Sequence, residues 1–144
     1  MIALPGPVLE DIREHGRLSY PEECCGGLLG ALREGVARVV RAERMENVSR
    51  QRRERRFEIE PRDYLRLEKA AGEAGLTVLG FYHSHPNHPA APSAYDREQA
   101  LPFLHYVIVA VEGGRPGEAT SWILSEDRGV FEPEELLLEA PGSV

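Results

Sequence analysis

One apolar stretch that ends in two histidines constrains the fold more than any other part of the chain. Residues Gly75–Tyr82 are apolar and bounded by glycine, a pattern typical of a buried strand. Side chains on a strand repeat every second residue, so His83 and His85 should point to the same side. Pro86 cannot donate to a sheet ladder, so we expect the strand to end there. The pattern therefore predicts a pair of imidazoles at the end of a buried strand.

A second polar pair, Ser93 and Asp96, follows shortly after. Their spacing of three places both side chains on one face of a helix that begins near Ser93. The pair is also typical of a helix N-cap with an acidic residue in the first turn, which needs no metal. A His-x-His at a strand end is likewise often ordinary polar surface. Taken together, the two pairs favour a zinc site with His83, His85 and Asp96 as ligands and a fourth position for water.

Composition limits the classes of protein to which the chain can belong. Its 144 residues suit one domain, so we expect residues 1–144 to fold as a single unit. A formal net charge of −7 argues against nucleic-acid binding, and no apolar run approaches the roughly 20 residues of a membrane span. Residues 1–5 carry no signal-peptide core, and the adjacent Cys24 and Cys25 offer no disulfide framework. We therefore expect a cytoplasmic protein without membrane contact.

Periodicity and turn signals divide the chain into helices and strands. Helices are expected over Pro7–His15 with an end at Gly16, over Pro61–Ala74, from about Ser93 to Ala100, and over Glu132–Glu139. Strands are expected in the second half of Cys24–Leu32 and over Val36–Ala42, Phe57–Ile59, His105–Val111, Thr120–Leu124 and Val130–Phe131. Residues 43–49 and 113–117 should be irregular. Glycine within Gly26–Gly30 indicates close approach by another backbone or a ligand.

Three features have both a structural and a functional interpretation. Arg50–Arg56 holds five arginines in seven residues, which favours a solvated, mobile loop over a flap that guides an acidic partner or a peptide tail. Cys24 and Cys25 are favoured as small core residues over nucleophiles. His88 is favoured as a surface residue over a substrate contact.

Hydrolysis by a metal-bound water also needs a general base, and a carboxylate is the usual choice. Glu23, just before the glycine-rich strand, is the strongest candidate. Spacing alone does not separate it from other glutamates that are also available, namely Glu22, Glu46, Glu58 and Glu60.

Two motifs carry a resemblance to a known family. They are Glu23-Cys24-Cys25-Gly26-x-Leu28-x-Gly30 and His83-x-His85-Pro86-x6-Ser93-x-x-Asp96, in order and at the expected local spacing. Together they resemble the JAMM, or MPN+, zinc metalloprotease family over about Tyr20 to Ala110. The resemblance implies an α/β fold, a single domain with a curved mixed β-sheet flanked by helices, similar to the cytidine-deaminase architecture.

The resemblance also implies a role for each site residue. His83, His85 and Asp96 would bind one Zn²⁺ per chain. Glu23 would take a proton from the zinc-bound water and deliver it to the leaving amine, and Ser93 would donate a hydrogen bond to the oxyanion. Zinc lowers the pKa of bound water towards about 7 and polarises the scissile carbonyl. A placed oxyanion donor contributes roughly 3 kcal/mol.

Members of this family hydrolyse peptide or isopeptide bonds at the C-terminus of ubiquitin or ubiquitin-like proteins. The short chain resembles stand-alone prokaryotic members, several of which act on sulfur-carrier proteins that end in Gly-Gly and remove residues such as cysteine. We therefore expect a ubiquitin-like or sulfur-carrier partner whose tail threads a narrow groove as an added strand. A homodimer is compatible with the resemblance.

Two other functions compete with hydrolysis. A catalytically silent MPN-type scaffold would only hold protein partners, but silent relatives lack ligands that this chain keeps. A deaminase-like enzyme would need a His/Cys-x-Glu and Pro-Cys-x-x-Cys signature, which the sequence does not contain. The motifs therefore favour a zinc peptidase.

Overall fold

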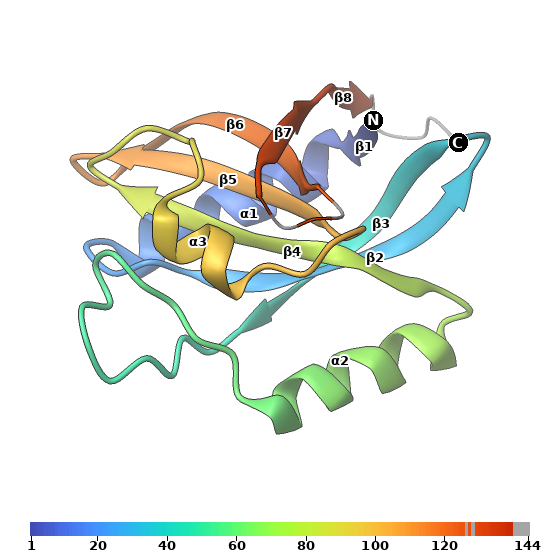
Figure 1. The fold of residues 1–144 in the computed structure, drawn as a ribbon, viewed down its shortest axis with the longest axis horizontal. Coiled ribbons are helices and arrows are strands. Elements are labelled where there is room, and N and C mark those ends of the chain that lie inside the picture. Colours follow the sequence, from blue (N-terminus) through green and yellow to red (C-terminus); the bar gives the residue numbers. More distant parts are fainter. Residues whose placement is uncertain (126, 128, 140–144) are drawn as a thin grey trace.

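Strand β4, Thr77–Pro86, is central in the computed structural model, which describes residues 1–125, 127 and 129–139 (Figure 1). It pairs antiparallel with β2, Cys25–Arg33, and parallel with β5, His105–Glu112. The other strands are β1 (Ile2–Pro5), β3 (Val36–Met45), β6 (Arg115–Leu124), β7 (Phe131–Glu134) and β8 (Leu136–Glu139). The helices are α1 (Gly6–Ser19), α2 (Pro61–Glu73) and α3 (Ala94–Gln99). Across the described residues the eight strands form one curved sheet in the order β7-β6-β5-β4-β2-β3-β1-β8.

Helices cover both faces of this sheet. Helix α1 packs through Ile12 into a core cluster that contains Tyr82 of β4. Helix α2 packs through Leu67 into a second cluster that contains Phe81 of β4 and Ala100, which follows α3. Adjacent residues of a strand point to opposite faces. Helix α1 therefore lies on one side of the sheet, and α2 and α3 lie on the other (Figure 1).

The glycine-rich start of β2 fits closely against its neighbours, as the sequence predicted. A Cβ at Gly26 would lie 2.5 Å from the backbone carbonyl oxygen of Glu43 and would overlap the Tyr82 ring, and a Cβ at Gly27 would overlap the Leu67 side chain. Glycine therefore lets β2 lie directly against β4 and beneath α2. The expected elements that correspond to β2, β3, β5, β6, α2 and α3 are confirmed.

The helix expected over Glu132–Glu139 is wrong, because this segment forms β7 and β8. In β7, Pro133 pairs with Trp122 of β6, and in β8 Leu136 pairs with Ile2 of β1. Helix propensity is a weak preference, and pairing with two otherwise open sheet edges outweighs it.

Smaller differences concern element boundaries. Helix α1 continues past Gly16, where a Cβ would lie 3.1 Å from Val111 Cγ2, so this glycine serves a close contact with β5. The strand expected at Phe57–Ile59 is wrong, because these residues join no ladder. Strand β1 was not anticipated, β3 runs on to Met45, and β6 begins at Arg115. Within the described residues no helix has the length and apolar character needed to cross a membrane.

Candidate metal centre

The two histidines at the end of β4 lie side by side, as predicted. Their Nε2 atoms are 3.1 Å apart, and His83 and His85 are each 1% exposed. Both residues share the strand face of Phe81, so their rings point toward the side of α2 and α3. The strand ends at Pro86, also as predicted.

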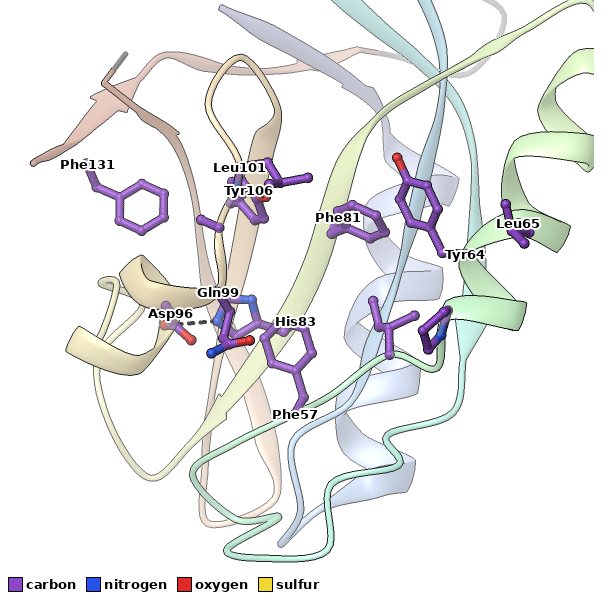
Figure 2. Close-up of a pocket in the computed structure, with 13 residues that line it drawn as sticks. Phe57, Tyr64, Leu65, Phe81, His83, Asp96, Gln99, Leu101, Tyr106 and Phe131 are labelled. Atoms are coloured by element: carbon purple, nitrogen blue, oxygen red, sulfur yellow. Dashed lines mark hydrogen bonds and ion pairs between the residues drawn. The ribbon is translucent and has the colours of Figure 1, made fainter. Parts of the chain in front are cut away.

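Asp96 reaches the histidines from the first turn of α3, and Figure 2 shows its contact with His83. Its Oδ2 atom lies 3.1 Å from Nε2 of His83 and 3.0 Å from Nε2 of His85. The residue is 6% exposed. Two ring nitrogens and one carboxylate oxygen therefore converge in a buried space.

Ser93 and Asp96 also form the helix cap that was the structural alternative for this pair. Oγ of Ser93 accepts the backbone N–H of Asp96 at 3.0 Å, and Oδ2 of Asp96 accepts the backbone N–H of Ser93 at 2.9 Å. This capping box fixes the carboxylate relative to the backbone. The cap and the approach of Asp96 to the histidines therefore coexist.

The hydrogen bonds of His85 indicate that the cluster is built for a cation. Nδ1 of His85 lies 2.7 Å from the carbonyl oxygen of Pro89 and must donate to it, because a carbonyl cannot donate. In a neutral ring Nε2 then carries a lone pair, which faces the carboxylate oxygen of Asp96 at 3.0 Å. A proton or a metal ion between these two acceptors would remove their repulsion. The donor set of two imidazoles and a carboxylate suits Zn²⁺, and the Pro89 contact is the outer hydrogen bond that such a ligand uses.

Glu23 completes the cluster from the segment just before β2. The side chains of Glu23, His83, His85 and Asp96 offer ligand atoms that all lie within 4.8 Å of one another. Glu23 is 1% exposed, and among the described residues neither of its carboxylate oxygens has a hydrogen-bond partner. Burial raises its pKa to about 8, with a smaller lowering by His85 and a smaller raising by Asp96.

The two carboxyl groups of the cluster have opposite protonation preferences. Burial raises the pKa of Asp96, but the neighbouring His83 and His85 and the Ser93 N–H together lower it further, to well below its usual range. Asp96 therefore stays ionised, whereas Glu23 can hold or release a proton near neutral pH. This division between two nearby carboxyl groups is typical of sites that move protons.

The structure separates Glu23 from the other glutamates that spacing left available. The Glu22 side chain is 49% exposed and pairs with Arg53 at 3.6 Å. The remaining three are exposed, and none joins the buried cluster: Glu46, Glu58 and Glu60. The predicted site residues Glu23, His83, His85, Ser93 and Asp96 are therefore brought together.

A residue that the sequence did not reveal holds the backbone at Glu23. Nδ2 of Asn47 donates to the carbonyl oxygens of Glu23 at 3.1 Å and Arg56 at 2.9 Å, while its Oδ1 accepts the N–H of Ser49. The N–H of Glu23 in turn donates to the carbonyl oxygen of Arg53 at 2.7 Å. The arginine-rich loop is thus tied to the candidate base through its backbone, although most of its side chains are exposed. A single asparagine in an irregular segment carries no sequence signal for this role.

An apolar cavity of about 500 Å³ adjoins the cluster (Figure 2). His83 and Asp96 form part of its wall, and Phe57 stacks on the His83 ring with a centroid distance of 4.7 Å. Four further aromatic rings line the cavity, namely Tyr64, Phe81, Tyr106 and Phe131. Sequence reasoning assigned Phe57 to a strand and missed this contact.

A second, more polar cavity of about 590 Å³ lies next to the cluster. Ser93 and His88 line it, and His88 stacks on His85 with ring centroids 4.1 Å apart. The expectation that His88 is an ordinary surface residue is therefore wrong, because the ring is partly buried against a cluster residue. The other described residues on its wall are Pro21, Glu54, Arg55, Pro86 and Asn87.

The adjacent cysteines are core residues, as favoured from the sequence. Both are buried, and Cys24 packs in the cluster beneath α1. Burial raises the pKa of Cys24 to about 11 and raises the pKa of Cys25 further. Neither thiol can form the thiolate that a nucleophile requires at neutral pH.

Sequence comparisons agree with this arrangement. The family of prokaryotic homologues of the JAB domain matches residues 5–125. Desampylase of Haloferax volcanii is 36% identical over 108 residues, 74% of this chain and 75% of its own length. The probable TtuB-protein conjugate cleaving protease of Thermus thermophilus is 34% identical over 115 residues, 80% of this chain and 74% of its own. CysO-cysteine peptidase of Mycobacterium tuberculosis is 30% identical over 120 residues, with coverage of 83% and 80%.

Solved structures show the same fold. A protein from Salinibacter ruber superposes with a TM-score of 0.77 at 43% identity and covers 100% of this chain and 95% of its own. A JAB1/MPN domain protein from Archaeoglobus fulgidus superposes with a TM-score of 0.58 at 18% identity, with coverage of 96% and 97%, and supports the fold alone. The family match over residues 5–125 and the curated relatives show that the chain belongs to the prokaryotic homologues of the JAB domain, within the JAMM/MPN proteins.

Proposed function

We propose that the protein is a zinc-dependent peptidase or isopeptidase that hydrolyses the bond after the C-terminal Gly-Gly of a small ubiquitin-like or sulfur-carrier protein. The observation that carries the proposal is the buried convergence of Glu23, His83, His85 and Asp96 within 4.8 Å. The activities for which the relatives are named, which include desampylase and CysO-cysteine peptidase, support hydrolysis of peptide or isopeptide bonds and this class of substrate.

His83, His85 and Asp96 would hold one Zn²⁺. Their nitrogens and carboxylate oxygen already face one another, and the Pro89 carbonyl fixes the His85 tautomer that ligation needs. When bound, zinc lowers the pKa of a water molecule and polarises a carbonyl group.

Glu23 would move the proton. Its carboxylate accepts a proton from the attacking water and later donates it to the leaving amine. A pKa near 8 suits both directions, since general acid–base catalysis is most efficient when the pKa lies close to the operating pH.

Ser93 would stabilise the oxyanion. Its Oγ accepts the N–H of Asp96, so the hydroxyl proton stays available to donate to a negatively charged oxygen. The residue is partly exposed, so a substrate carbonyl can reach the hydroxyl.

The carrier tail would cross the apolar cavity rather than extend the sheet. Both edges of β4 are already paired, with β2 and β5, so an added strand has no edge beside the cluster. Phe57 and Ile59 line the cavity from a segment that belongs to no strand, and an extended tail would lie along this segment. Glycine at the end of the tail would permit the close approach that the buried cluster demands.

The alternative, a silent scaffold, fits the buried groups less well. A buried carboxyl without a hydrogen-bond partner costs roughly 1–3 kcal/mol or more, and Glu23 has two such oxygens among the described residues. Binding a partner does not require this buried carboxyl group, whereas a hydrolase uses it as a general base.

The decisive experiment combines metal analysis with hydrolysis. Purified parent, Glu23→Gln and Glu22→Gln proteins are analysed for zinc and incubated with Gly-Gly-ending carriers that bear a C-terminal extension. We expect about one zinc per chain in all three, with cleavage after Gly-Gly in the parent and in Glu22→Gln only. Mass spectrometry identifies the bond. Cleavage by zinc-free parent, or undiminished cleavage by Glu23→Gln, contradicts the proposal.

A further inference from the structure

The apolar and polar cavities described above are two of the cavities beside the cluster, and they differ in chemistry. The apolar cavity has His83 and Asp96 on its wall, and the polar cavity has Ser93 on its wall. Ser93 and Asp96 are the two members of one capping box, so the cavities meet at the cluster. A substrate held at the cluster can therefore extend into both cavities.

The charged residues on the cavity walls indicate which cavity holds the carrier tail and which holds the leaving residue. Apart from His83 and Asp96 themselves, the described residues that line the apolar cavity are uncharged (Figure 2). The polar cavity carries the cation Arg55 and, next to it in the sequence, the anion Glu54. A single residue attached to a carrier has a free α-carboxylate one residue beyond the scissile bond, and such an anion needs a cation and N–H donors. The leaving residue therefore belongs in the polar cavity, and the carrier tail belongs in the apolar one.

His88 provides a second partner in the polar cavity. Its Nε2 is buried and has no hydrogen-bond partner among the described residues. The ring is held in place by stacking on His85, with an interplanar angle of 19°. By contrast, the neighbouring amide of Asn87 already bonds Tyr20 and the N–H of Gly113. A buried nitrogen without a partner needs an explanation, and a bound water, ion or ligand group beside the ring would provide one.

We propose that Arg55 and His88 form a subsite for the α-carboxylate of a single C-terminal residue attached to the carrier. The proposal rests on the proposed hydrolytic function and narrows its substrate class to single-residue adducts. Water adds to the scissile carbonyl, the C–N bond breaks, and the proton passes to the amine of the released amino acid. Glu54, the carboxylate on the same wall, is suited to the ammonium group of that product. A lysine side chain within a conjugated protein lacks this carboxylate and is the poorer substrate.

Binding without turnover tests the subsite. Zinc-loaded Glu23→Gln protein is titrated, with NMR detection, with a carrier-tail peptide that ends in Gly-Gly-Ala and with its C-terminal amide. We expect the acid to bind about 10-fold more tightly than the amide. In the Glu23→Gln protein, the further substitution Arg55→Ala should make the affinities for acid and amide equal. The further substitution Arg50→Ala should leave the difference in affinity unchanged. Arg50 is the matched control, because it is an exposed arginine of the same loop outside the polar cavity.

The subsite is refuted if the acid and the amide bind with equal affinity, or if neither binds. It is also refuted if the acid still binds more tightly than the amide after Arg55→Ala. Hydrolysis of the same two peptides by the parent separates this result from the proposed function. Equal cleavage of both peptides refutes the subsite and keeps the peptidase. Selective binding of the acid without any cleavage keeps the subsite and refutes the peptidase.

Discussion

Asp96 caps its own helix with the same oxygen that faces the histidines: its Oδ2 accepts the Ser93 N–H at 2.9 Å and lies 3.0 Å from Nε2 of His85. The reciprocal bond, from the N–H of Asp96 to Oγ of Ser93, closes the capping box. The helix start therefore positions both the candidate ligand and the candidate oxyanion donor.

Replacing these two residues should have different effects. Ser93→Ala should keep zinc but lower kcat by roughly 100-fold, and loss of the cap should lower the free energy of unfolding by about 1 kcal/mol. Asp96→Asn should keep an oxygen that can cap but lose zinc, because a neutral amide is a weak ligand. Zinc analysis, kinetics and urea unfolding measure the three quantities. Ser93→Thr, which retains the hydroxyl, is the control, and loss of zinc from Ser93→Ala contradicts the division of roles.

Zinc removal should destabilise the fold. Among the described residues, buried carboxylate oxygens of Glu23 and Asp96 have no hydrogen-bond partner, and a bound cation would stabilise this arrangement. Free zinc at 100 times its Kd adds about 2.7 kcal/mol to the free energy of unfolding. We expect the Tm of the parent to fall on chelation and to recover with zinc. The Tm of His85→Ala should respond to neither treatment, and an equal response in that variant would falsify the site.

Asn47 should act as a positioning residue for Glu23. Asn47→Ala removes two donors to loop carbonyls and should lower kcat by roughly 10-fold at unchanged zinc content, since the base is displaced rather than removed. KM should change less than kcat. The matched control is Gln51→Ala, an exposed amide side chain of the same loop. Equal kinetics for the two variants would contradict the role.

Stability should fall in mild acid through His15. Nδ1 of His15 is 2.7 Å from the Tyr82 hydroxyl, and burial, with a smaller effect of Arg44, lowers its pKa from 6.5 to about 4. Between pH 4 and pH 6.5 the unfolded chain binds more protons than the folded one. The contribution of neutral His15 to the free energy of unfolding is therefore complete above pH 6.5 and is lost as the pH falls toward 4.

Because His15 is only half buried, we discount its contribution to about 1 kcal/mol. Urea unfolding of parent and His15→Gln between about pH 7 and about pH 4 measures it. The difference in stability between the two proteins should shrink toward the acid end. A constant difference across this range would show that His15 is not the responsible group.

The cysteines should resist alkylation in the native state. Burial raises the pKa of both Cys24 and Cys25, so the thiolate fraction is small and the sulfurs are inaccessible. Iodoacetamide at about pH 8 should modify neither residue in folded protein and both after unfolding in urea. Mass spectrometry counts the adducts. Native modification that abolishes hydrolysis would restore the nucleophile interpretation.

Sequence alone predicted the parts that local geometry controls. The imidazole pair follows from the two-residue repeat of one strand, and the approach of Asp96 to Ser93 follows from one helical turn. The glycines before Leu28 also predicted close packing correctly. The two motifs indicated the family, and the family match over residues 5–125 confirms that assignment.

The tertiary structure decided everything that depends on partners distant in sequence. Glu23 reaches the histidines because β2 and β4 pair with Cys25 opposite His83, and continuing that register brings Glu23 toward His85. The strand at Leu136–Glu139, where a helix was expected, exists only because β1 offers an open edge. Asn47 gained its contact with the carbonyl oxygen of Glu23 in the same way, from a segment 24 residues away. Local residue order determines the direction of a side chain, whereas the neighbours that it meets depend on which distant segments pair and bury one another.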